Sequence, residues 1–180
     1  GLLALDLETS GFDYHTEKIV AISLCCTDKK AVYLPIAHDD PDYQNKQPKL
    51  EDVKKVLQPL LKSKKVLKII QNAKFDLHFL KSCGFDVDGP IFDTMLAARL
   101  VRPEWQRVGL EALCQDYLDM TIPSYTQMFG DKTSYSSVKV NVGAPYGAND
   151  ALMAYKLKSI LEKELKKHDQ EKLLTKLSCH

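Results

Sequence analysis

Near the start of the chain, apolar residues run together in short stretches separated by polar clusters, which is the pattern of β-strands. The stretches are Leu2–Leu7, Lys18–Cys26 and Lys30–Ile36. A polar tight turn at Thr27–Lys29 joins the second to the third. We therefore expect three antiparallel strands, followed by an exposed polar loop over residues 37–48, which contains two prolines.

A helical period begins after that loop, with apolar residues three or four positions apart over Leu50–Leu61. A β-branched strand at Val66–Ile70 comes next, and a helix over Asn72–Cys83 ends before Gly84. Residues 121–145 are polar and show no clear period. The remaining expected elements are a short strand at Ile91–Phe92, helices at Thr94–Val101 and Leu110–Leu118, and a long helix from about Ala148 to Lys166.

This order of elements is typical of an α/β fold with a mixed five-stranded sheet flanked by helices. The length of 180 residues and the 44% hydrophobic content fit a single domain, 1–180. Residues 157–180 form a Lys- and Glu-rich helical tail with leucines at helical spacing, including Leu157, Leu173 and Leu177. Such a tail caps its own domain or docks on another, and we favour self-capping.

The first strand carries two carboxylates, Asp6 and Glu8, in an otherwise apolar run. Alternate side chains of a strand share a face, so the two acids project together and repel each other unless a cation lies between them. Asp76 follows a strand early in a helix, and we place Asp150 in the first turn of the long helix. Four acids from three segments could therefore form a site for hard divalent cations, and two such ions catalyse phosphodiester hydrolysis.

Taken one at a time, these acids also fit blander explanations, such as a solvated strand edge, a helix surface or a favourable charge at a helix start. The formal net charge of +1 identifies no partner. Five cysteines without a CxxC pair indicate a reduced, mostly core setting, and no apolar run approaches the roughly 20 residues of a membrane span. Gly1 opens directly onto the first strand without a methionine, so we expect a fragment or a processed chain.

Together these segments resemble the DEDD superfamily of 3′–5′ exonucleases, which share an RNase H-like fold. Asp6 and Glu8 match the first family motif, Asp-x-Glu. Asn72 and Asp76 match the second, in which Asp follows Asn by four residues. The resemblance covers almost the whole chain and implies an RNase H-like sheet.

The third motif exists in a tyrosine and a histidine version, and Tyr146 with Asp150 fits the tyrosine version, Tyr-x-x-x-Asp. Pro145 stands where the other version needs its histidine. The segments VYLPIAHDD, IIQNAKFDLHFL and IFDTMLAARL are similar, in order and spacing, to the proofreading domain of family A DNA polymerases. No polymerase palm or fingers follows within the 180 residues.

The resemblance implies a role for each acid. Asp6, Glu8 and Asp150 would bind one divalent ion, Asp6 would bridge to a second, and Asp76 would support that ion through water. Tyr146 would orient the attacking water. The implied cofactors are two Mg²⁺ ions, for which Mn²⁺ substitutes.

Four further residues are candidates for substrate contact. Phe12 stacks on terminal bases or packs in the core, and the sequence favours neither. Gln71 and Asn72 would hydrogen-bond the terminal nucleotide, and Arg107 would contact a phosphate.

The expected function is a metal-dependent 3′–5′ exonuclease that releases nucleoside 5′-monophosphates from single-stranded or frayed DNA 3′ ends. The expected partner is a polymerase domain of the same parent chain. We expect a monomer without membrane contact, in a bacterial cytoplasm or a DNA-containing organelle. The alternatives are a stand-alone enzyme acting on RNA, like RNase D, or Werner-like, and a non-catalytic nucleic-acid-binding scaffold.

Overall fold

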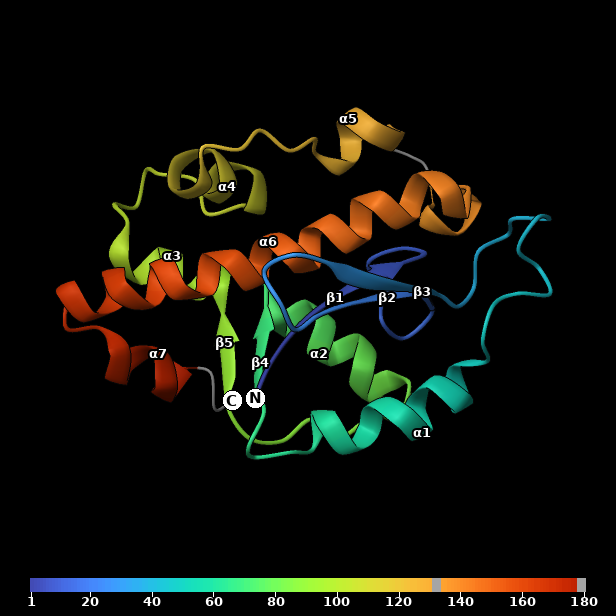
Figure 1. The fold of residues 1–180 in the computed structure, drawn as a ribbon, viewed down its shortest axis with the longest axis horizontal. Helices are drawn as coiled ribbons and strands as arrows, with labels where there is room; N and C mark the ends of the chain where they lie inside the picture. Colours follow the sequence, from blue (N-terminus) through green and yellow to red (C-terminus); the bar gives the residue numbers. More distant parts are fainter. Residues whose placement is uncertain (131–133, 178–180) are drawn as a thin grey trace.

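A computed structural model describes residues 1–130 and 134–177 of the chain. Within these residues five strands form one sheet in the order β3-β2-β1-β4-β5 (Figure 1). β1, β2 and β3 are antiparallel, whereas β1, β4 and β5 are parallel. The expected mixed sheet is therefore confirmed. The strands are β1 (Leu2–Thr9), β2 (Ile19–Cys25), β3 (Ala31–Pro35), β4 (Leu67–Ile70) and β5 (Ile91–Asp93).

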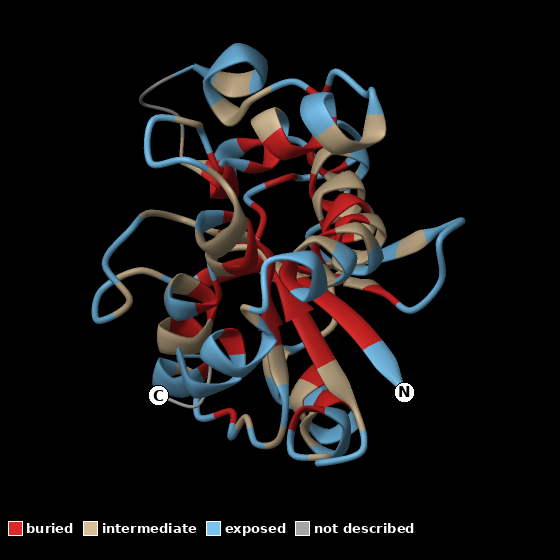
Figure 2. Ribbon diagram, turned by 90° about the vertical axis from the view of Figure 1, so that its left-hand side faces the viewer, coloured by how far each residue is buried: buried red, intermediate tan, exposed pale blue. Residues whose placement is uncertain are grey.

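Helices cover both faces of this sheet. The side chains of Leu5 and Leu7 point to one face, where they pack with α1 (Leu50–Leu61) and α2 (Ala73–Ser82). The long helix α6 (Val140–Lys167) crosses the other face. Three shorter helices pack against α6 and complete the second core: α3 (Thr94–Val101), α4 (Leu110–Leu118) and α7 (Glu171–Leu177). Figure 2 shows that buried residues concentrate in the strands and in the inner sides of the helices.

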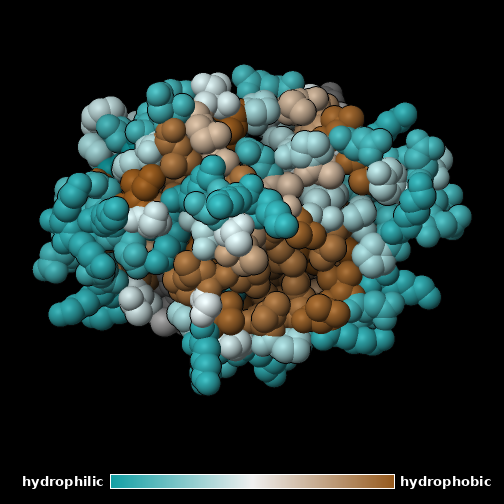
Figure 3. Space-filling view, in the orientation of Figure 1, coloured by the Kyte–Doolittle hydropathy of each residue, from teal (hydrophilic) through white to brown (hydrophobic). Residues whose placement is uncertain are grey.

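Part of the surface over the strands and α1 is apolar. Figure 3 shows apolar residues gathered in the middle of this face and polar residues around them. α1 buries Val53, Leu57 and Leu61. Val56 and Leu60, on its outer side, are exposed. α1 is therefore amphipathic, and its outer side also carries two exposed apolar residues.

The long C-terminal helix begins at Val140, so the expected start near Ala148 is wrong. Its first amide is held by a distant residue, since the backbone N–H of Val140 donates to Asp40 Oδ2 at 2.9 Å. Pro145 lies inside the helix. Asp150 is consequently well inside α6 rather than in its first turn. The unassigned polar segment contains a short helix, α5 (Tyr125–Phe129), and a 3₁₀ turn, η1 (Tyr135–Ser137).

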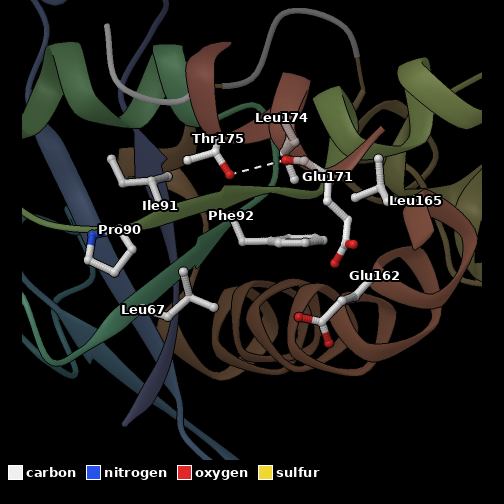
Figure 4. Close-up of a pocket in the computed structure, with 9 residues that line it drawn as sticks. All are labelled: Leu67, Pro90, Ile91, Phe92, Glu162, Leu165, Glu171, Leu174 and Thr175. Atoms are coloured by element: carbon white, nitrogen blue, oxygen red, sulfur yellow. Dashed lines mark hydrogen bonds between the residues drawn. The ribbon is translucent and has the colours of Figure 1, made fainter. Parts of the chain in front are cut away.

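Part of the C-terminal tail packs on the protein's own core, as the self-capping alternative predicted, while Leu173 and Leu177 are exposed. Leu157, Leu161 and Leu165 of α6 are buried, and so is Leu174 of α7. Figure 4 shows how α7 lies over the β5 edge of the sheet, with Leu174 and Thr175 facing Phe92 across a small pocket. The last residues of the predicted tail, 178–180, lie outside the described residues.

The four described cysteines are all free, but only Cys25 and Cys114 are buried, while Cys26 is exposed. Burial raises the pKa of the Cys114 thiol to about 12. The expectation that the cysteines lie mostly in the core is thus half right. Among the described helices, none is long and apolar enough to cross a membrane.

Candidate active site

Three carboxylates from two distant segments meet at the centre of the sheet. Asp6 and Glu8 lie on β1, opposite Ser23 and Ala21 of β2. Because their neighbours Leu5 and Leu7 point into the core under α1 and α2, the two acids face α6. One carboxylate oxygen from each of Asp6, Glu8 and Asp150 lies within 4.8 Å of the others. A strand with partners on both sides holds ligands more rigidly than a loop would.

Small residues let α6 approach these acids closely. A Cβ atom on Gly147 would lie 3.1 Å from Glu8 Oε1 and 3.0 Å from Ser23 Oγ. A Cβ atom on Gly143 would lie 2.9 Å from the Tyr135 hydroxyl. One turn apart on the same side of α6, the two glycines bring the helix close enough for Asp150 to reach β1.

Asp76 lies at the same site but outside the group of three. It is 3% exposed, in the first turn of α2 directly after β4. Its charge raises the pKa of both Asp6 and Glu8, which places it near them. A hydrogen bond from the Leu7 backbone lowers the pKa of Asp76 and ties its carboxylate to β1. All four predicted acids are therefore brought together.

Burial is the largest influence on the pKa values of these acids. The pKa of each of Asp6, Glu8, Asp76 and Asp150 is raised well above its ordinary value, first by desolvation and then by a neighbouring carboxylate. Glu111 also raises the pKa of Asp150. Among the described residues no cation lowers the pKa of these acids, and a bound metal ion would do so.

The donor set fits a hard divalent cation. All the candidate ligand atoms are carboxylate oxygens, which Mg²⁺ and Ca²⁺ prefer. Glu8 Oε1 is buried and has no hydrogen-bond partner in the described part of the chain. The spacing of up to 4.8 Å is close to the width of a coordination sphere whose oxygens lie roughly 2.0–2.6 Å from the ion.

Tyr146 stands one helical turn before Asp150, inside an aromatic cluster. Its ring packs edge-on against Phe129, with ring centres 5.2 Å apart, and it also contacts Tyr125 and Tyr135. Burial and the nearby acids raise the pKa of Tyr146, so its hydroxyl stays protonated at neutral pH. A hydrogen bond from this hydroxyl lowers the pKa of Asp150. Tyr146 is thus a neutral donor at the edge of the site.

A second layer of polar side chains, which the sequence analysis did not identify, supports Glu8. The Tyr135 hydroxyl donates to the Gly143 carbonyl at 2.8 Å, and it lies close enough to Glu8 to lower the pKa of that carboxylate. Tyr33 lies beside Tyr135, and its hydroxyl is 2.6 Å from His38 Nε2. The other nitrogen of this buried histidine is 2.7 Å from the Val138 carbonyl oxygen. The segment VYLPIAHDD, noted above only for its resemblance, contains two of these residues.

Asp93 fixes the start of α2, a role that sequence reasoning also missed. Its carboxylate accepts hydrogen bonds from the backbone amides of Asn72 and Ala73, at 3.2 and 2.9 Å, and from those of Met95 and Leu96. One buried carboxylate thereby caps both α2 and α3. Asn72 has the left-handed backbone angle φ of 60°. The position of Asp76 therefore depends on Asp93.

Gln71 makes two hydrogen bonds inside the protein. Its Nε2 donates to the Val108 carbonyl at 3.0 Å, and its Oε1 accepts from the Thr94 hydroxyl. Gln71 thereby ties the end of β4 to α3 and to the loop before α4. Its contact with the terminal nucleotide stays a prediction.

The other substrate candidates are at the surface. Phe12 is 90% exposed, so the core-packing alternative is wrong, and its ring lies 6.3 Å from that of Phe75 on α2. Asn72 and Arg107 are also exposed. Asn72 makes no side-chain cap to α2, which leaves its amide group at the surface beside the acids.

Comparison with known proteins identifies the class to which this fold and acid cluster belong. A family described as 3′–5′ exonuclease, of the DNA polymerase A type, matches residues 1–166. The chain therefore belongs to the DNA polymerase A 3′–5′ exonuclease family.

Its relatives include whole polymerases. DNA polymerase I of Borreliella burgdorferi is 28% identical over 96% of this chain, which spans only 18% of that protein. Among solved structures, Brucella melitensis NrnC is 26% identical with a TM-score of 0.77, over 98% of this chain and 79% of that one. NrnC structures with bound Mg²⁺ and bound to pGG are also similar to this chain. Escherichia coli RNase D, 14% identical with a TM-score of 0.73 over 97% and 42% of the two chains, shares the fold.

Proposed function

We propose that this chain is a 3′–5′ exonuclease that uses two divalent metal ions to release nucleoside 5′-monophosphates from DNA 3′ ends. The observation that carries the proposal is the group of three carboxylates within 4.8 Å, together with the unpartnered Glu8 Oε1. Family membership supports the exonuclease reaction. The number of ions, Mg²⁺ as the natural ion and Mn²⁺ as its substitute, and DNA as the substrate are parts of the proposal.

Each of the four acids has its own part in binding the proposed metal ions. Asp6, Glu8 and Asp150 would hold one ion, and Asp6 and Asp76 would help to hold the second. Such a pair of ions, when bound, would lower the pKa of the attacking water and offset charge on the leaving oxygen. The high apparent pKa values of the free acids fit this arrangement, because ligands that repel each other in a buried site gain most from a cation.

The remaining residues orient the reactants. The Tyr146 hydroxyl, which donates its proton to Asp150, accepts a hydrogen bond from the attacking water and so aligns it. The water oxygen bonds to phosphorus as the bond to the 3′ oxygen breaks, and that oxygen leaves with a proton. The products are one nucleoside 5′-monophosphate and a strand shorter by one nucleotide.

Exposed side chains contact the reactive end of the substrate. Phe12, exposed and edge-on to Phe75, offers a ring face for the terminal base. The Asn72 amide hydrogen-bonds the terminal nucleotide, and Arg107 contacts a phosphate. Because all three are exposed, a strand reaches them without any rearrangement of the core.

The similarity to polymerase I supports a proofreading domain attached to a polymerase. We also propose that the chain is monomeric. On this view the protein works where DNA is copied, in a bacterial cytoplasm or a DNA-containing organelle. The second candidate function is a stand-alone exonuclease that acts on RNA, and the likeness to NrnC, one structure of which is bound to pGG, supports it. A non-catalytic scaffold is disfavoured, because all four acids and Tyr146 are retained.

The test uses 5′-labelled single-stranded DNA and RNA of one sequence, with Mg²⁺ or Mn²⁺. We expect stepwise shortening of DNA from the 3′ end, and a loss of at least about 10³-fold in rate for Asp6→Ala, which removes a proposed ligand of both ions. Asp28→Asn, in an exposed turn, is the matched control and should keep full activity. An Asp6→Ala variant as active as the parent would refute the proposal. A large preference for the RNA strand would favour the second candidate function over a DNA exonuclease.

A further inference from the structure

Beyond the acids, the molecule has a groove near the β5 edge of the sheet, which Leu177 of α7 also lines. It has a volume of about 840 Å³ and lies between α2 and α3, over β5. Asn72, four residues before Asp76, is one of the residues that line it. Its apolar lining includes Leu77, Met95, Leu96 and Val108. Through Asn72 the groove therefore adjoins the start of α2, the helix that carries Asp76.

The rim of this groove is positively charged. Lys74, His78 and Lys81 follow each other at helical spacing on the outer side of α2, and Arg99 faces them from α3. None of the ion pairs in the described residues includes Lys74, Lys81 or Arg99. The one acid of the lining, Asp93, is already bonded to four backbone amides. The groove thus presents cations to an anionic ligand.

Beyond Arg99 the surface carries an exposed tryptophan. Trp105 is 80% exposed, and a second hollow, lined by Arg99, Glu104 and Trp105, adjoins the groove through Arg99. The loop between α3 and α4, which carries Trp105, is nevertheless held in place. Arg99 Nη1 donates to the Glu104 carbonyl at 3.1 Å and to the Gln106 carbonyl at 3.3 Å. A large apolar ring held outward on an anchored loop, beside Arg99, is an arrangement that can stack nucleic-acid bases.

We propose that the groove and Trp105 form a second binding site for single-stranded nucleic acid, which holds the nucleotides on the 5′ side of the reactive end. Phosphates lie along Lys74, Lys81 and Arg99, and a base stacks on Trp105. The inference rests on the proposed function for its direction, because a strand that reacts at its 3′ end can extend only in the 5′ direction. It predicts that affinity rises with strand length until Trp105 is reached.

Trp105 is the only tryptophan of the chain, so its fluorescence reports this site alone. The experiment titrates wild-type protein in EDTA, where no hydrolysis is proposed to occur, with a thymidine dinucleotide, a dodecamer of thymidine and a dodecamer of uridine. We expect quenching by the dodecamers and none by the dinucleotide. Equal quenching by both dodecamers would show that the site binds DNA and RNA alike. Quenching by only one of them would show that the site is specific for that nucleic acid.

Anisotropy with a labelled dodecamer then measures the contributions of single residues. Trp105→Ala should weaken binding by about 5- to 150-fold, and Val56→Ala, an exposed apolar control on α1, should not. Lys81→Ala should lower the slope of log affinity against log salt by about one, whereas Lys29→Ala, in the turn after β2, should leave it unchanged.

The outcomes separate this inference from the proposed function. Quenching without any hydrolysis in Mg²⁺ would keep the second site and remove the exonuclease. Hydrolysis with no quenching, and with an unchanged KM of Trp105→Ala for every strand length, would overturn the second site alone. Quenching by an acidic peptide but not by either strand would replace the nucleic acid with a protein partner.

Discussion

Replacing Asp6 by asparagine should stabilise the metal-free protein while abolishing its response to metal. One oxygen each of Asp6, Glu8 and Asp150 lies within 4.8 Å of the others. At an effective dielectric constant of about 20, two charges separated by that distance repel by about 3.5 kcal/mol. Asparagine keeps the shape of the side chain and removes one charge, so it relieves repulsion with two neighbours.

The effect of Asp6→Asn on the free energy of unfolding depends on pH. The pKa of Asp6 is raised in the folded protein, mainly by burial and then by Asp76. A raised carboxyl pKa favours folding at low pH, where the group is protonated, and this contribution is lost as the pH rises through the folded pKa. The advantage of Asp6→Asn should therefore be largest at pH 8 and shrink at pH 4.5.

We expect a net gain of about 1–2 kcal/mol after the site relaxes, which is a rise in Tm of about 2–8 °C for a chain of this size. Thermal unfolding in EDTA at both pH values measures it, with Asp28→Asn as the control. Mg²⁺ at about 100 times its Kd should then stabilise the wild type by about 2.7 kcal/mol and leave Asp6→Asn nearly unchanged. A lower Tm for Asp6→Asn than for the wild type in EDTA at pH 8 would refute the reasoning.

Three further substitutions test how the site is built. Gly147→Ala should lower activity and cost about 1–3 kcal/mol in unfolding experiments, because the new Cβ meets Glu8 at 3.1 Å; unchanged kcat would contradict this. Tyr33→Phe, which leaves His38 without its hydroxyl partner, should cost about 1–3 kcal/mol in the same measurement and weaken Mg²⁺ binding by calorimetry. Asp93→Asn should expose the amides of both helix starts to faster hydrogen exchange, and unchanged exchange would exclude its capping role.

The sheet and the acids of β1 could be predicted because their signals are local. An apolar run with two acids at alternate positions fixes both the strand and the face that the acids share. The helix that follows β4 is equally local, so Asp76 could be placed at its start. The prediction that these acids meet Asp150 rested on the order of the motifs along the chain. No single segment carries a physical signal for that contact.

The start of α6 could not be predicted because its cap is distant in sequence. Asp40, 100 residues earlier, accepts the first amide, and the helix then continues through Gly143 and Pro145, which in isolation disfavour it. Tertiary packing overrides the local preference, since the two glycines are needed for close approach to Tyr135 and Glu8. The hydrogen bonds of Gln71 were hidden for the same reason, because its partners lie on α3 and in the following loop.

The most direct test of the central claim is the shortening of a 5′-labelled DNA strand as the Mg²⁺ concentration rises from zero. The account predicts a ladder that recedes from the 3′ end, appears only with Mg²⁺ and is lost in Asp150→Asn, while Asp28→Asn matches the wild type. A ladder of equal strength in EDTA, or in Asp150→Asn with Mg²⁺, would contradict it.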